Sequence, residues 1–186
     1  MRMLMVLLTF IAATAFAGPA PTAVKKVGSC PSGYSTSGNY CNPGANARYA
    51  LPKVGSCASG YSTSGAYCLA SQSARHAVEK VGSCPSGYST SGAYCLQSSR
   101  KEMGRMTATA LAKTGSCPSG YSTSGNYCRP SGNARYAVAK IGSCPSGYST
   151  SGNYCLASSS ARHAVAKGGS CPSGYSTSGA YCLSSR

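Results

Sequence analysis

Twelve cysteines recur along the 186-residue chain in six pairs, and the two members of a pair always lie eleven positions apart. This spacing does not match the C-x2–4-C pattern of zinc sites, so oxidation to disulfides is the chemistry that we expect. The constant local spacing predicts a bond within each pair. The predicted pairs are Cys30 and Cys41, Cys57 and Cys68, Cys84 and Cys95, Cys117 and Cys128, Cys144 and Cys155, and Cys171 and Cys182.

Tyrosines and basic residues recur with the cysteines. Tyrosine rings beside cations suit stacking on sugars or bases, and the alternative is that the two rings of a repeat pack across their own hairpin. The candidate tyrosine contacts are Tyr34, Tyr40, Tyr61, Tyr67, Tyr88, Tyr94, Tyr121, Tyr127, Tyr148, Tyr154, Tyr175 and Tyr181. The candidate basic contacts are Lys53, Lys80, Lys140 and Lys167, together with Arg48, Arg75, Arg135 and Arg162.

The charge balance indicates which partners the chain would attract. Lys and Arg number 17 against two acids, which gives a formal net charge of +15. Such a charge favours polyanions, so we expect anionic surface polysaccharide, lipid head groups or extracellular nucleic acid as partners, with self-association as a further expectation. Six weak sites on one chain would bind by avidity. The alternative is a soluble chain that repels its own copies.

The residues needed for catalysis are scarce. Glu79 and Glu102 are the only acids and lie outside the repeated loops, and the chain has no Asp for a calcium loop and no Gly-rich phosphate motif. His76 and His163 occupy matching positions, where Tyr49 and Tyr136 stand in other repeats. We interpret each histidine as a partly stacked ring beside an arginine rather than a metal ligand. The sequence therefore predicts neither an enzyme nor a cofactor or metal site.

Two levels of repetition organise the chain. The segment CPSGYSTSGNYC at 30–41 returns five more times with small changes, and a shift of 87 residues maps the first three repeats onto the last three. We interpret 18–26 as an N-terminal lead, 27–100 as three disulfide-hairpin repeats, 101–112 as a linker, and 113–186 as a copy of the first block. The blocks read as two arms, about 20–100 and 107–186, joined near KEMGRM.

The first seventeen residues have the pattern of a secretory signal peptide. Arg2 precedes an apolar run, and a small-x-small end predicts cleavage between Ala17 and Gly18. The predicted localisation is therefore secreted, or periplasmic or at the cell surface, where disulfides persist.

The composition predicts small disulfide-stapled β-hairpins in an all-β repeat array with little or no central hydrophobic core, after a helical signal peptide. Beyond residue 17 the chain holds few Leu, Ile or Val side chains and no Phe. In the first repeat, Cys30–Gly33 predicts a type I turn with Pro31 in its second position. Thr36–Gly38 predicts a three-residue loop, which places Tyr34 opposite Tyr40.

The spacers between the loops leave alternatives open. Residues 137–142 alternate like an extended strand, whereas residues 158–165 fit either a strand or a short capped helix. The repeats would either stack or stay separate on a flexible string. In the stacked arrangement, a leucine after the second cysteine covers a neighbouring repeat; these leucines are Leu69, Leu96, Leu156 and Leu183.

Each repeat resembles the last disulfide hairpin of EGF-like modules, which reads C-x-x-G-Y-x(n)-C. In the first repeat the match runs from Cys30 through Gly33 and Tyr34 to Cys41. A full module has six cysteines, one of them at the position that Gly28 occupies here. The resemblance implies the shape of the hairpin.

Three functions compete. The first is a secreted, cationic, structural or adhesive repeat protein that binds anionic surface polymers multivalently. The second is a precursor cut at its basic spacers into small disulfide-cyclised peptides. The third is a secreted cationic antimicrobial or toxin, for which the chain lacks an amphipathic helix with a large apolar face.

Overall fold

A computed structural model describes residues 19–99 and 103–185, and these residues form an all-β protein. Eighteen short strands make six three-stranded antiparallel sheets, one for each repeat. The predicted fold class of disulfide-stapled hairpin repeats is confirmed. No long apolar helix that would cross a membrane occurs in these two segments. The predicted signal peptide and its cleavage site at Ala17 and Gly18 lie outside them.

Three kinds of strand make up each sheet. The first strand of each repeat comes from the spacer: β1 (Val24–Lys25), β4 (Ala50–Pro52), β7 (Ala77–Glu79), β10 (Leu111–Ala112), β13 (Ala137–Ala139) and β16 (Ala164–Ala166). The second is the YSTS segment: β2 (Tyr34–Ser37), β5 (Tyr61–Ser64), β8 (Tyr88–Ser91), β11 (Tyr121–Ser124), β14 (Tyr148–Ser151) and β17 (Tyr175–Ser178). The third contains the second cysteine: β3 (Tyr40–Pro43), β6 (Tyr67–Ala70), β9 (Tyr94–Gln97), β12 (Tyr127–Pro130), β15 (Tyr154–Ala157) and β18 (Tyr181–Ser184).

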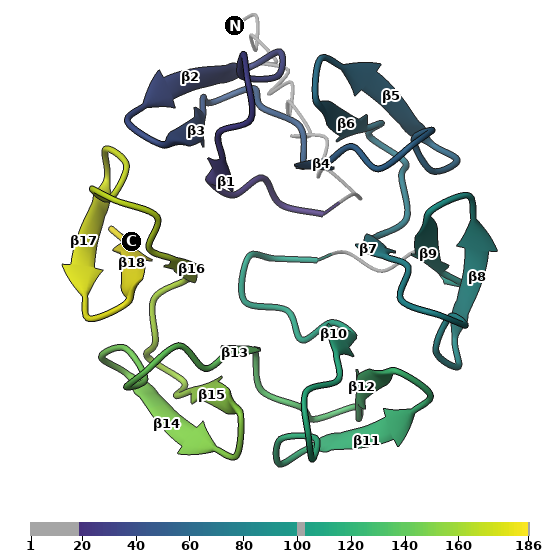
Figure 1. The fold of residues 1–186 in the computed structure, drawn as a ribbon, viewed down its shortest axis with the longest axis vertical. Coiled ribbons are helices and arrows are strands. Elements are labelled where there is room, and N and C mark those ends of the chain that lie inside the picture. The colour runs from purple at the N-terminus through teal and green to yellow at the C-terminus, as the bar shows by residue number, and fades with distance from the viewer. Residues whose placement is uncertain (1–18, 100–102, 186) are drawn as a thin grey trace, which may run out of the picture.

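The six sheets stand in a closed ring (Figure 1). Within every sheet the third strand lies in the middle, as in the order β1-β3-β2. The spacer strand faces the axis of the ring and the YSTS strand lies at the periphery (Figure 1). Radial repetition of sheets is the principle of β-propellers, although the sheets here have three strands. The two arms therefore form one ring.

The six predicted disulfides are present, one in each repeat. Each closes a hairpin in which the threonine of the YSTS strand lies directly opposite the second cysteine, as Thr36 lies opposite Cys41. The threonine hydroxyl approaches the first cysteine of the pair, with Thr36 Oγ1 3.5 Å from Cys30 Sγ. Six intramolecular disulfides indicate an oxidising compartment, extracellular or periplasmic.

The predicted register of the hairpin is wrong. Ser37 pairs with Tyr40 and Tyr34 pairs with Pro43, so the loop has two residues rather than three. Gly38, the first of them, has a φ of 57°, which suits the type II′ turn that matches the twist of the strands. Because side chains alternate along a strand, this register places Tyr34 and Tyr40 on opposite faces of the sheet.

The turn at the first cysteine also differs from the prediction. The Tyr34 amide donates to the Pro31 carbonyl at 3.0 Å, so the turn spans 31–34 with Gly33 in its third position. The φ of Gly33 is 84°, as a type II turn requires. Pro31 is thus the first residue of the turn, where a fixed φ is not needed. The same turn forms in the second repeat, where Ala58 stands at this position.

The tyrosine that opens the middle strand joins neighbouring sheets. The Tyr67 hydroxyl donates to the Lys25 carbonyl at 2.8 Å and accepts from the Val27 amide at 2.6 Å, both in the preceding repeat. It also lies 3.6 Å from Cys41 Sγ. At the same junction the Ser32 backbone amide donates to Ser64 Oγ at 3.0 Å. The same set of contacts occurs at each of the other junctions between consecutive repeats.

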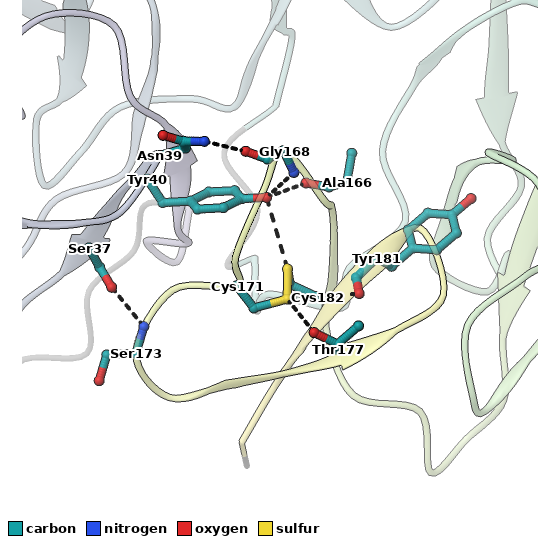
Figure 2. Close-up of a disulfide and its surroundings, with 10 residues drawn as sticks. All are labelled: Ser37, Asn39, Tyr40, Ala166, Gly168, Cys171, Ser173, Thr177, Tyr181 and Cys182. Atoms are coloured by element: carbon teal, nitrogen blue, oxygen red, sulfur yellow. Dashed lines mark hydrogen bonds between the residues drawn. A yellow bond between two sulfur atoms is a disulfide. The ribbon is translucent and has the colours of Figure 1, made fainter.

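The same contacts close the ring between the last repeat and the first. The Tyr40 hydroxyl donates to the Ala166 carbonyl at 2.8 Å and accepts from the Gly168 amide at 2.6 Å. The Ser173 amide donates to Ser37 Oγ at 2.8 Å, and Asn39 Nδ2 donates to the Gly168 carbonyl at 2.7 Å (Figure 2). The closing junction therefore has the geometry of the other five.

The buried apolar side chains lie between sheets. One cluster joins Leu51 and Cys68 of the second sheet to Tyr94 and Leu96 of the third. Another joins Cys155 of the fifth sheet to Leu183 of the sixth. Leu69, Leu96, Leu156 and Leu183 are all buried. The stacked arrangement is therefore correct, the flexible string is wrong, and the spacers are extended rather than helical.

Candidate functional site: a basic face on the ring

Six lysines occupy one equivalent position in the six sheets. Each directly follows its spacer strand, and its backbone amide donates to a carbonyl of the hairpin turn, as Lys26 does to Asn39 at 2.8 Å. Because the six junctions are equivalent and the ring closes, equivalent positions lie on one circle around the axis. We call this set the lysine crown; its members are Lys26, Lys53, Lys80, Lys113, Lys140 and Lys167, and all are exposed.

The sequence reasoning found four of these lysines and missed Lys26 and Lys113. Both precede their cysteines in the pattern K-x-G-S-C that every repeat shares. They were missed because Lys26 ends the N-terminal lead and Lys113 directly follows the linker, where the surrounding residues differ from those of the other spacers. The shared pattern would have identified them.

The backbone beneath the lysine crown is fixed by the tyrosines of the junctions. The residue after each lysine donates its amide to the tyrosine hydroxyl of the next repeat, at 2.5 to 2.8 Å in all six cases. The carbonyl of the residue before each lysine accepts from the same hydroxyl at 2.8 to 2.9 Å. The lysines therefore project from a rigid base, while their long side chains stay in water.

The predicted arginines lie at the other end of the spacer strands. Arg75 and Lys80 flank β7 from its two sides, so about 16 Å of extended chain separates them. Arg48 and Arg135 are exposed, whereas Arg75 and Arg162 are half-buried. The structure thus places the lysines at equivalent positions around the ring and the arginines at the opposite ends of the spacer strands.

The tyrosines of the middle strands are not a stacking platform, and that prediction is wrong for them. Their exposed fractions are 0 to 2%, because each ring is inserted between two sheets. These residues are Tyr40, Tyr67, Tyr94, Tyr127, Tyr154 and Tyr181. The structure does not support the alternative of ring packing across one hairpin either, since the two tyrosines of a repeat lie on opposite faces.

The tyrosines of the outer strands hold the spacers in place. The Tyr34 hydroxyl donates to the Arg48 carbonyl at 2.8 Å, and the equivalent bond recurs in three other repeats. In the third and sixth repeats the hydroxyls of Tyr88 and Tyr175 instead accept from the amides of Ala110 and Ala23. These rings are half-buried. Burial raises the pKa of Tyr148 to about 12, so its hydroxyl remains a donor at any physiological pH.

No family model, curated protein or solved structure matches this chain.

The two histidines lie near the axis, on the side of the ring where the spacer strands begin. The His76 ring is tilted against Tyr49 with 5.6 Å between centroids, and His163 against Tyr136 with 5.5 Å. All four rings line one cavity of about 150 Å³ together with Arg105. Nothing in the described part of the chain gathers three or more metal-binding side chains of the His, Cys, Asp or Glu type. In each pair the histidine ring packs against the tyrosine ring at a tilt of 43° for His76 and 41° for His163.

The N-terminal lead and the linker meet beside this cavity. The Ala20 amide donates to the Met103 carbonyl at 2.9 Å, and Arg105 Nε donates to the Pro21 carbonyl at 3.2 Å. The described parts of both segments, from residues 19 and 103 onward, run inside the ring of sheets (Figure 1). They bury the histidines, whose Nδ1 atoms have no hydrogen-bond partner.

The buried histidines predict a stability that falls with acidification. Burial lowers the pKa of His76 to about 4, and burial together with Arg105 lowers that of His163 to about 4, from an ordinary value of 6.5. Between pH 6.5 and 4 the two histidines are protonated in the unfolded chain but stay neutral in the folded protein. Each histidine therefore lowers the free energy of unfolding by up to ~3 kcal/mol as the pH falls from 6.5 to 4. The full stability is present above pH 6.5.

Denaturant unfolding at pH 7, 5.5 and 4 measures this dependence, and His76→Gln with His163→Gln should flatten it. The background is small because the chain has only two acidic residues. An unfolding free energy that stays constant from pH 7 to 4 in the native protein would contradict the prediction.

Proposed function

We propose that this protein is a secreted, non-enzymatic scaffold that adheres to anionic surfaces through multivalent contact of its lysine crown. The observation that carries the proposal is the exposure of six lysines at equivalent positions of one closed ring. A rigid circle of cations contacts an anionic surface at several points at once. The second and later contacts are then intramolecular and add avidity without any new chemistry.

The interlocked junctions support an intact ring over a precursor that is cut into separate peptides. Each repeat buries its middle-strand tyrosine against the repeat before it, and each spacer strand is part of a sheet. Cleavage in the spacers would remove a strand from every sheet and expose these tyrosines. The structural role of the repeats is thus to hold the crown, and the disulfides keep it rigid in an oxidising compartment.

Replacement of four crown lysines should weaken adhesion to an anionic matrix. We expect the variant Lys53→Gln, Lys80→Gln, Lys140→Gln and Lys167→Gln to bind a carboxymethyl-dextran surface at least tenfold more weakly at low salt, because each lysine near such a surface contributes roughly 1 kcal/mol. Surface plasmon resonance over a salt series measures the loss. Raising the ionic strength should weaken the native protein in the same way.

A matched control removes the same charge from the other end of the spacer strands. It replaces Arg48, Arg75, Arg135 and Arg162 with glutamine, and we expect it to lose less affinity than the lysine variant. Equal losses for the two variants would show that net charge alone governs binding, and the role of the crown would be refuted.

A further inference from the structure

The lysine crown carries apolar side chains beside its cations. In four of the six repeats the residue after the crown lysine is Val or Ile, and its side chain is 39 to 50% exposed. These residues are Val27, Val54, Val81 and Ile141, and among the described residues they are the large hydrophobic side chains that stand exposed. Thr114 and Gly168 occupy the two remaining positions.

These apolar side chains are held outward by a fixed backbone. The amides of all four donate to buried tyrosine hydroxyls, at 2.5 Å for Val81 and 2.6 Å for the other three. The backbone therefore cannot turn the side chains inward. Since equivalent positions lie on one circle, the four apolar groups and the six lysines form one ring-shaped surface on one face of the protein.

The shape of this surface distinguishes between anionic partners. Figure 1 looks down the shortest axis of the molecule, so the ring is a disc with a broad face. A flat anionic layer meets every position of a circle at once, whereas a single polymer strand follows only part of it. Apolar side chains among lysines match the boundary between charged head groups and acyl chains, since apolar burial and electrostatic attraction both contribute to binding there.

A second copy of this chain fits the surface poorly. The molecule carries a net charge of +15, and the other ends of its spacer strands present arginines. Face-to-face or face-to-back association would place cations opposite cations. Charge complementarity therefore requires an anionic occupant.

We propose that the crown face docks on the surface of an anionic lipid bilayer, with Val27, Val54, Val81 and Ile141 entering the head-group layer. This inference rests on the proposed function and names the partner of the same surface. The lysines supply attraction to the lipid phosphates, and the apolar side chains give a preference for lipid over other polyanions. Glu79 is the one acid among the described residues. It is exposed and directly precedes Lys80.

Vesicle sedimentation tests the proposal on the full-length protein. The probes are vesicles of phosphatidylcholine with 30% phosphatidylglycerol and vesicles of phosphatidylcholine alone, at 150 mM salt. We expect binding to the first and at least tenfold weaker binding to the second. The variant Val27→Ser, Val54→Ser, Val81→Ser and Ile141→Ser should bind anionic vesicles at least tenfold more weakly, while its untouched lysines retain binding to carboxymethyl-dextran.

A matched control places four substitutions on the outer strands. Its changes are Ser35→Ala, Ser62→Ala, Ser122→Ala and Ser149→Ala, and it should bind vesicles like the native protein. The lipid inference is overturned if the Val/Ile variant binds vesicles as tightly as the native protein does. It is also overturned if the native protein binds carboxymethyl-dextran but no vesicles. Either result leaves the proposed function standing. Native protein that binds neither refutes both. If the native protein forms oligomers in the absence of vesicles and the Val/Ile variant does not, a second copy of the chain is the occupant of this surface.

Discussion

Reduction of the six disulfides is expected to unfold the ring. Each bond closes a loop between cysteines eleven positions apart, which stabilises the folded state by about 3 kcal/mol in the chain-entropy model. Six such contributions together exceed the ~5–15 kcal/mol of net stability that is typical of a domain. Amide chemical-shift dispersion, recorded before and after treatment with a phosphine reductant, measures the loss of structure.

Removal of one bond gives the matched control. The variant Cys57→Ala with Cys68→Ala should remain folded, because five disulfides and the junctions persist, and its unfolding free energy should fall by about 3 kcal/mol. A fully reduced protein that keeps its native spectrum would show that the packing between sheets suffices without the disulfides.

The variant Tyr40→Ala is expected to open the ring. Truncation of a buried aromatic ring of this size costs about 3–5 kcal/mol, and the Tyr40 hydroxyl makes two of the hydrogen bonds that join the first repeat to the last. Tyr40 and Ala166 are 126 positions apart in the sequence, so no short stretch of chain holds the first and last repeats together. Small-angle X-ray scattering should report a larger radius of gyration than that of the native ring.

Tyr67→Ala is the control for this effect. It removes the same contacts at the junction of the first and second repeats, which a short spacer also links. We expect a similar loss of unfolding free energy but a native radius of gyration. If Tyr40→Ala stayed as compact as Tyr67→Ala, the closing junction would not be what keeps the ring shut.

The hairpin was predicted from local signals, and its register was not. Glycine at the turn and cysteines at a constant spacing are local features that act within a dozen residues. The YSTS strand, however, carries polar or half-buried side chains at every position, so neither face is marked as the buried one. Register is weakly specified in such a strand. The predicted pairing of Tyr34 with Tyr40 differs from the observed pairing by an odd number of residues, and such a shift moves one tyrosine to the other face.

The candidate site was only partly accessible to sequence reasoning. The lysines could be counted from their pattern, but their gathering into a circle depends on how each sheet is rotated relative to the next. The middle-strand tyrosines were predicted to stack on ligands because basic residues accompany them, with packing across their own hairpin as the alternative. In the structure they lie buried between sheets, because the chain has few other large apolar side chains that could fill the junctions.

The stapled hairpin, the number of repeats and the excess of positive charge could be predicted from the amino-acid sequence, because they follow from residue types and from the spacing of the cysteines. The closure of the array into a ring and the shared face of the lysines became visible only in the folded structure. Closure requires that the rotations between neighbouring sheets add up to one full turn over the six repeats, and no single repeat encodes that sum.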